Sequence, residues 1–332
     1  MGLTRAEWRT LAKRRLNNIL RSHIVANERT LEQKISDSGP SYQRAEPHIL
    51  TIALRELQLT GEVLSRTIDR TPWYYLSQTP IHQVDQRLEQ LTPIYDATQE
   101  GTFVSRLGQT LEIAVYKGLL PYERHRQFLG HFSDLDLHGE ETPYTKVDPP
   151  QMIGRKILQK GRLDFVVFGD GGPAGIEAKN YRMWLYPDRE QIRDLFRKCC
   201  DLDAVPVLIA RRLPYLTFQL FRYSGAIVHQ TYNQLYFNLD RELGEKARHK
   251  SLLGYHDIRF GTDPDGRLLK FIGTHLPNVL PEARQRFDTF KTLHARYGNN
   301  NLTYREWMRQ ILLTVGIWTE AEPPEGYSDQ SP

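Results

Sequence analysis

The chain has 332 residues, of which 39% are hydrophobic and 25% are charged. This balance excludes a largely disordered chain, and the length allows one large domain or two ordinary ones. No run approaches the roughly 18 apolar residues of a membrane helix, and the N-terminus lacks the apolar core of a secretory signal. We therefore expect a cytoplasmic protein without membrane contact.

The basic residues are in excess only near the N-terminus. The formal net charge is +4, and residues 1–70 hold 12 Lys and Arg against 8 Asp and Glu, whereas the remaining residues hold 32 of each kind. A localised positive field favours a polyanion such as DNA as partner. Charge alone is equally compatible with an ordinary solvated surface.

Residues 1–78 have the pattern of a small helical domain that ends in a β-hairpin. Apolar residues recur at helical spacing in three stretches, and Asn27 and Pro47 are good first residues for the second and third helix. Two β-like runs then flank a polar loop. The predicted elements are helices at about 8–22, 28–36 and 47–60 and strands at 62–64 and 73–76.

This order resembles a winged helix-turn-helix domain. In that family the third helix enters the DNA major groove, so the resemblance implies nucleic-acid contacts by the residues that lead into this helix. They are Tyr42, Gln43, Arg44 and His48. A small helical interaction domain that touches no nucleic acid gives the same pattern and remains the alternative. Residues 79–100 are predicted to form a connecting helix, from Ile81 to about Leu91, and a turn.

Residues 101–225 have the pattern of a mixed α/β domain. A long amphipathic helix carries Glu112 beside its apolar stripe, and two short strands follow a polar, irregular segment at 121–160. The glycine-rich turn between the strands lacks the Gly-Lys-Ser/Thr ending of a phosphate loop, so we interpret it as a hairpin turn. The predicted elements are helices at 102–120 and about 189–200 and strands at 163–168, 174–179 and 205–210.

The C-terminal third is less regular. Residues 226–318 are predicted to extend the α/β domain, with a β-like piece at Arg267–Ile272, helices at about 282–297 and 304–313, and a disordered tail at 319–332. The two cysteines, Cys199 and Cys200, are adjacent, and neighbouring cysteines rarely form a disulfide. We expect them to be buried thiols.

Three charged residues lie within the otherwise apolar strands of the hairpin. Asp164 is in the first strand, and Glu177 and Lys179 alternate with apolar residues in the second. Alternate residues of a strand point to the same side, and a tight hairpin brings Asp164 opposite the other two. Neighbouring buried carboxylates are unfavourable unless a cation neutralises them, and oxygen ligands suit Mg²⁺ or Mn²⁺.

The segment Gly161-Arg162-Leu163-Asp164, followed later by Glu177-Ala178-Lys179, resembles the PD-(D/E)xK nuclease superfamily. Leu163 stands where the family motif has Pro. The order of a helix with Glu112, a strand with Asp, a turn, a strand with Glu-x-Lys, a helix and a strand is also similar. The resemblance covers about residues 101–215. It implies a restriction-endonuclease-like core, in which helices flank a mixed sheet.

The same resemblance implies a metal-dependent DNA endonuclease that leaves a 5′-phosphate and a 3′-hydroxyl. Lys179 would orient or activate the attacking water, and the metal, Mg²⁺ or Mn²⁺, would act as Lewis acid and generate the nucleophile. The implied catalytic residues are Asp164, Glu177, Lys179, Glu112 and Gln191. The implied metal ligands are Asp164, Glu177, the backbone carbonyl of Ala178 and, through water or a second ion, Glu112.

Several alternatives stay open at this point. The charged trio is also compatible with a structural salt-bridge cluster, and Gln191 with a solvated helix position. The aromatic and basic stretch 180–186 fits either stacking on nucleic acid or capping of the core. The leading hypothesis is a restriction-like role in defence or DNA processing. The protein would act as a homodimer or in a larger defence or transposition complex. The rivals are a non-catalytic nucleic-acid-binding or assembly protein on the same fold and a nuclease that acts on RNA.

Overall fold

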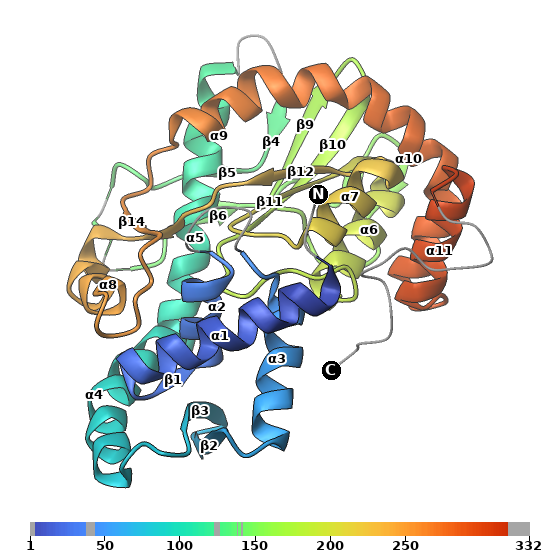
Figure 1. Cartoon of the computed structure of the whole chain (residues 1–332). Coiled ribbons are helices and arrows are strands. Elements are labelled where there is room, and N and C mark those ends of the chain that lie inside the picture. The colour runs from blue at the N-terminus through green and yellow to red at the C-terminus, as the bar shows by residue number, and fades with distance from the viewer. Residues whose placement is uncertain (1–3, 38–43, 123–126, 138, 141, 318–332) are drawn as a thin grey trace. The chain divides into compact units, whose positions relative to one another are not determined.

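The computed structural model describes residues 4–37, 44–122, 127–137, 139–140 and 142–317 (Figure 1). The chain forms two compact units. The N-terminal unit comprises Met1–Ser105 and Asp240–Ile258, and the second unit comprises Arg106–Leu239 and Arg259–Pro332. This division differs from the predicted boundaries, because the predicted linker helix and a segment of the predicted C-terminal extension both join the N-terminal unit. The predicted tail at 319–332 lies outside the described residues.

The N-terminal unit contains the predicted three helices and hairpin, together with one short strand that was not predicted. Its strands form an antiparallel sheet in the order β1-β3-β2. Helix α8 from the later segment packs on α4. The elements are α1 (Arg5–His23), β1 (Ala26–Asn27), α2 (Glu28–Ile35), α3 (Pro47–Leu59), β2 (Val63–Ile68), β3 (Thr71–Leu76), α4 (Ile81–Gln99) and α8 (Arg241–Arg248).

Local sequence signals account for these elements. The Asn27 side chain accepts a hydrogen bond from the Thr30 backbone N–H at 2.9 Å, so the predicted N-cap of α2 is confirmed. Helix α4 continues through Pro93 beyond its predicted end, because Tyr95 is buried edge-on against Trp73 with ring centroids 5.6 Å apart. Tertiary packing thus outweighs the local preference of proline to end a helix.

The second unit is built on a five-stranded mixed sheet, which confirms the predicted α/β class. The strand order is β12-β11-β10-β9-β4, with β10 antiparallel to β9 and parallel to β11. Short antiparallel pairs, β5–β6 and β7–β8, fill the segment predicted to be irregular. The strands are β4 (Phe128–Leu129), β5 (His131–Phe132), β6 (Lys146–Val147), β7 (Met152–Ile153), β8 (Lys156–Ile157), β9 (Phe165–Gly169), β10 (Gly172–Lys179), β11 (Val205–Ala210) and β12 (Ile227–Gln230).

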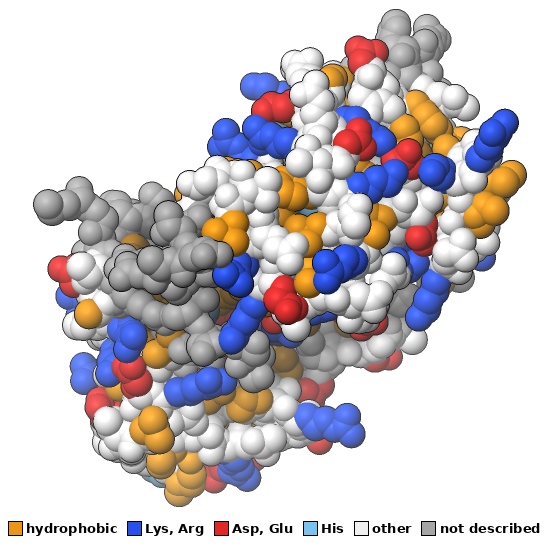
Figure 2. All heavy atoms as spheres, turned by 90° about the vertical axis from the view of Figure 1, so that its right-hand side faces the viewer, with side chains coloured by type: hydrophobic (Ala, Val, Ile, Leu, Met, Phe, Trp, Pro, Cys, Tyr) orange, Lys and Arg blue, Asp and Glu red, His pale blue; other side chains and the backbone are white. Residues whose placement is uncertain are grey.

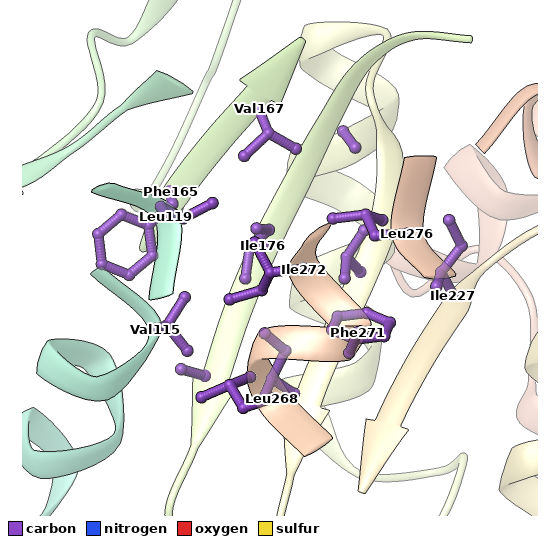
Figure 3. Close-up of a cluster of buried hydrophobic side chains, with 14 of the residues drawn as sticks. Val115, Leu119, Phe165, Val167, Ile176, Ile227, Leu268, Phe271, Ile272 and Leu276 are labelled. Atoms are coloured by element: carbon purple, nitrogen blue, oxygen red, sulfur yellow. The ribbon is translucent and has the colours of Figure 1, made fainter. Parts of the chain in front are cut away.

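Helices cover both faces of this sheet. One face carries Val167 and Ile176 and packs against α5 and the helices that begin near residue 266 (Figure 3). The other face carries Val166 and Leu208 and packs against α6, α7 and α11. The helices are α5 (Gly101–Leu119), α6 (Glu190–Leu202), α7 (Tyr215–Ser224), α9 (Gly266–Lys270), α10 (Leu276–Gly298) and α11 (Tyr304–Thr314).

The β-like piece predicted at Arg267–Ile272 is wrong. These residues form α9 and the first part of a π-helix, Phe271–His275. The Asp265 side chain caps α9 by accepting hydrogen bonds from the Arg267 and Leu268 backbone N–H groups. Leu268, Phe271 and Ile272 recur at helical spacing and point at the sheet in Figure 3. A local cap and a helical apolar stripe therefore outweigh the β-like composition.

The remaining short elements complete the described chain. Helices α10 and α11 end within one residue of their predicted C-terminal ends. Helix α10 starts six residues earlier than predicted. Cys199 is buried, Cys200 is partly buried, and both are free thiols. The short elements are two 3-10 turns, Leu120–Tyr122 and Asn238–Asp240, and the strands β13 (Gln234–Tyr236) and β14 (Ile258–Phe260).

A buried histidine joins three helices of the second unit. The His294 Nε2–H donates to the Ser224 carbonyl at 2.9 Å, and Nδ1 accepts from the Trp307 indole N–H at 3.1 Å. Burial lowers the pKa of His294 to about 4, although the Ser224 carbonyl opposes this shift. Both ring nitrogens are satisfied in the neutral form, and protonation would remove the acceptor that Trp307 needs.

We predict that this histidine makes the protein less stable in mild acid. The unfolded chain takes up a proton on this histidine near pH 6.5, whereas the folded chain excludes that proton down to about pH 4. The stability that the neutral histidine contributes is therefore fully present above pH 6.5 and is lost as the pH falls towards 4. The loss amounts to at most about 3 kcal/mol. Urea unfolding between pH 7 and 4 should show a smaller decline for His294→Asn than for wild type. His131→Asn, at an exposed site, is the control, and equal slopes for all three proteins would contradict the prediction.

Candidate active site

Asp164, Glu177 and Lys179 converge as the strand pattern predicts. Asp164 directly precedes β9, and its backbone N–H donates to the Ile176 carbonyl at 3.0 Å. Its side chain accepts from the Ala178 backbone N–H at 2.8 Å. The Lys179 ammonium lies 2.6 Å from Glu177 Oε2 and 4.0 Å from Asp164 Oδ2. The β9–β10 hairpin therefore brings all three side chains into one cluster.

Glu112 joins this cluster from α5 through a lysine that the sequence did not single out. Lys146, on the two-residue strand β6, donates to Glu112 Oε2 at 2.6 Å and to Asp164 Oδ1 at 2.7 Å. Its ammonium also lies 5.1 Å from the centroid of the Phe165 ring. A single, partly buried cation thus bridges the helix carboxylate and the hairpin carboxylate.

A second unpredicted lysine reaches Glu177 from α6. The Lys198 ammonium lies 2.7 Å from Glu177 Oε1 and 2.7 Å from Asp194 Oδ2. Glu177 is 3% exposed, so both of its carboxylate oxygens are buried and each accepts from a different lysine. Lys198 therefore fixes the orientation of the carboxylate that the resemblance assigns to the metal.

The cluster strongly perturbs its carboxyl groups. Burial, together with the charge of Asp164, raises the pKa of Glu112 to about 7 and that of Glu177 above its usual range. Burial would also raise the pKa of Asp164, but the charges of Lys179 and Lys146 lower it below its ordinary value. The pKa of Lys179 is raised despite burial, because the carboxylates of Glu177 and Asp164 stabilise its charge. Asp164 is thus a carboxylate and Lys179 an ammonium at neutral pH.

Gln191, the fifth predicted catalytic residue, forms no hydrogen bond with the cluster among the described residues. It lies in the first turn of α6. Lys198 follows seven residues later, which places it on the same face of the helix about two turns further along. Helix α6 therefore contributes a side chain to the cluster, as predicted, but this side chain is Lys198.

The stretch 180–186 serves the fold. The buried Asn180 amide donates to the Leu107 and Leu235 carbonyls, each at 2.7 Å, and Trp184 and Leu185 are buried. Of its two interpretations, capping of the core agrees with this packing.

The predicted nucleic-acid residues lie in the N-terminal unit, before or at the start of α3. Tyr42 and Gln43 lie outside the described residues. His48 Nδ1 lies 3.4 Å from Glu46 Oε2, and Arg44 is close enough for its charge to act on Arg15. Contact with nucleic acid at these residues stays a prediction.

The cluster provides the oxygen donors that a divalent cation requires. Asp164 and Glu177 approach the same lysine, and Lys146 shows that the space between Glu112 and Asp164 accepts a cation. Hard oxygen donors of this kind suit Mg²⁺ or Mn²⁺. Among the described residues, however, no three His, Cys, Asp or Glu side chains are gathered closely enough to form a metal site as they stand. Each carboxylate instead contacts a lysine ammonium, so an ion would have to displace at least one of them.

Comparison of the chain with models of protein families, with curated proteins and with solved structures finds no match. The functional argument therefore rests on the residues and geometry described above. None of the described helices is both long enough and apolar enough to cross a bilayer.

Gly175 lets α6 approach β10 closely enough for Lys198 to reach Glu177. A Cβ at position 175 would lie 2.6 Å from Leu163 Cδ1 and 2.9 Å from Cys199 Sγ, both closer than real Cβ contacts. The Cys199 thiol also lies 3.9 Å from the Gly175 carbonyl oxygen. The absence of a side chain here thus sets the distance between helix and sheet beside the charged cluster.

We predict that Gly175→Ala destabilises the protein by about 1–3 kcal/mol, because the added methyl group overpacks this contact. The free energy of unfolding in urea measures the effect. Gly108→Ala is the matched control, since nothing lies within 4 Å of its added Cβ and Ala is the better helix former by about 1 kcal/mol. A Gly175→Ala protein as stable as the control would show that the helix moves away freely.

Proposed function

We propose that the second unit is a metal-dependent nuclease that hydrolyses DNA phosphodiester bonds. The observation that carries the proposal is the convergence of Asp164, Glu177 and Lys179 beside Glu112 in one partly buried cluster. Carboxylates with a neighbouring ammonium are the groups that metal-assisted phosphodiester hydrolysis requires. A cluster of such strongly perturbed pKa values is also typical of active sites.

The order of elements supports a restriction-endonuclease-like core. Helix α5 carries Glu112, the β9–β10 hairpin carries the three residues of the motif, and α6 leads into β11, which runs parallel to β10. This is the succession that the resemblance to the PD-(D/E)xK superfamily implies. Fold alone does not establish an activity, so the cluster remains the principal support.

Asp164 and Glu177 would hold a Mg²⁺ or Mn²⁺ ion, with the Ala178 carbonyl and Glu112 as further ligands. When bound, the ion would supply Lewis acidity and a more acidic water molecule. Lys179 carries its proton at neutral pH and would donate hydrogen bonds to a phosphate oxygen or to the attacking water. Lys198 would keep the Glu177 carboxylate oriented, as positioning residues around metal ligands commonly do.

The N-terminal unit would bind the DNA. Its order α1-β1-α2-α3-β2-β3, with an antiparallel β2–β3 hairpin, supports the winged-helix-like interpretation. Arg44 lies just before α3 and His48 in its first turn, where this family contacts DNA. A restriction-like role in defence or DNA processing, as a homodimer or within a larger complex, follows by analogy with proteins that pair such modules.

The principal rival is a non-catalytic nucleic-acid-binding or assembly protein. One observation favours it: Lys146, Lys179 and Lys198 already satisfy the carboxylates, as in a structural salt-bridge network. A nuclease for RNA is the second rival, and matched DNA and RNA duplexes separate it from the first proposal.

A plasmid-cleavage assay tests the proposal. With Mg²⁺ or Mn²⁺ we expect cutting that EDTA abolishes, and at least about a hundred-fold loss of rate in Asp164→Asn and Lys179→Met, because each change removes a charge from the reaction centre. Glu242→Gln is the control, since this carboxylate is exposed on α8 and its loss should leave the rate unchanged. A wild-type protein that binds DNA but cuts neither DNA nor RNA would favour the non-catalytic rival.

Metal binding itself should respond to Lys146. Its ammonium donates hydrogen bonds to carboxylate oxygens of Glu112 and Asp164 that the ion would need as ligands. Lys146→Met should therefore bind Mn²⁺ at least about ten-fold more tightly, because the removal of a nearby positive charge favours a cation. Isothermal titration calorimetry gives this affinity without any nuclease assay. Lys156→Met, at an exposed strand position, should bind as wild type does. Unchanged or weaker binding by Lys146→Met would exclude competition between the lysine and the ion.

A further inference from the structure

The N-terminal unit contains a pocket that the proposed nuclease function does not use. Its volume is about 540 Å³, and side chains from α1, α2 and the segment 248–256 line it. This volume lies within the range of about 300–1,000 Å³ that is usual for small-molecule sites. It is therefore large enough for a group bigger than a lone inorganic ion.

The charged residues that line the pocket are all basic. Four Lys and Arg side chains and two histidines face it, and none of the lining residues, all of which the structure describes, is acidic. By contrast, Lys and Arg are interspersed with Asp and Glu on the face of the molecule shown in Figure 2. The basic lining residues are Arg15, Lys34, Arg248, Lys250, His23 and His256.

Two distant parts of the sequence supply these charges. Arg15 and Lys34 belong to the basic N-terminal segment, whereas Arg248 and Lys250 come from the segment 240–258, which leaves the α/β unit to join this one. The amphipathic pattern of α1 accounts for a solvated basic face, but it does not account for two further cations opposite that face. The fold thus concentrates like charges that the chain keeps far apart in sequence.

The cations are held in place by the backbone. Arg15 donates to the Ile35 and Lys34 carbonyls at 3.1 and 2.8 Å, at the C-terminal end of α2. The Lys34 ammonium donates to the Lys250 carbonyl at 3.2 Å. Gly254 has a φ of +71°, and a Cβ there would lie 2.6 Å from the Lys34 nitrogen. The glycine therefore leaves room for the ammonium.

The like charges in the pocket are only partly compensated. Within the described residues, Lys34 and Lys250 form no ion pair with a carboxylate, whereas Arg248 lies 3.3 Å from Glu245. Burial, followed by the charges of Lys250 and Arg87, lowers the pKa of Lys34 to about 8. Burial and the charges of Lys34, Arg87 and Lys250 lower the pKa of His23 to about 4. A bound anion would relieve this repulsion.

We propose that this pocket binds phosphate groups, with Lys34 and Lys250 as the principal contacts and Arg15 and Arg248 flanking them. Phosphate fits because its several oxygens accept from ammonium and guanidinium groups together. The phosphate belongs either to a free nucleotide or to the backbone of a polynucleotide. The inference is independent of the proposed nuclease activity, because it uses residues of the N-terminal unit alone.

Fluorescence anisotropy with the full chain in EDTA tests the site without cleavage. The probes are a labelled 5′-phosphorylated DNA duplex and labelled ATP, each competed with inorganic phosphate. We expect at least a ten-fold loss of affinity in Lys34→Gln/Lys250→Gln for the probe that the pocket binds. The control Lys13→Gln/Lys246→Gln removes two lysines of the same unit that pair with Glu56 and Glu242, and its affinity should fall less than three-fold.

The outcomes of this experiment distinguish the two possible sources of the phosphate group. Selective loss of ATP binding assigns the pocket to a free nucleotide, and selective loss of duplex binding alone assigns it to a polynucleotide backbone. If no probe binds wild type, or if both double variants weaken binding equally, the proposal is overturned. As a second readout on the wild-type protein, the bound probe should protect Lys34 from an acylating reagent, as mass spectrometry would show. Unchanged acylation of Lys34 at saturating probe would also overturn it.

Discussion

The candidate active site depends on the charge balance of a partly buried cluster. The carboxylates of Glu112, Asp164 and Glu177 lie where water is largely excluded, and such groups would normally take up protons or repel one another. They stay together because lysines lie among them, with Lys146 bridging two carboxylates and Lys198 holding a third. Any divalent ion must therefore compete with internal cations that the fold already supplies.

Strand β10 links this charge balance to the hydrophobic core. Its residues alternate, so that Ile176 and Ala178 enter the core beneath α5 while Glu177 points to the side covered by α6. The same alternation lets the Ala178 backbone N–H donate to the Asp164 carboxylate. A shift of one residue in the register with β9 would move the acid into the apolar core and the apolar residues out of it. The packing of the sheet thus specifies the site.

Much of this arrangement could be predicted from sequence, because it follows from local periodicity. The alternation around Glu177 and the turn before it were enough to predict the meeting with Asp164. Lys146 was missed because a two-residue strand in a polar segment has no periodic signal. Lys198 was missed because a lysine on an amphipathic helix normally indicates a solvated position, and only the close approach at Gly175 makes it buried. The membership of 240–258 in the N-terminal unit depends on long-range contacts, which periodicity does not encode.

The path of the chain through 240–258 has a consequence for folding during synthesis. The N-terminal unit lacks α8 and part of its basic pocket until residue 258 has left the ribosome, although its first helix is synthesised more than two hundred residues earlier. More than a hundred residues of the α/β unit must emerge in between. Contacts between segments so far apart in sequence close large loops and form slowly. The N-terminal unit can therefore be completed only after most of the α/β unit has been synthesised.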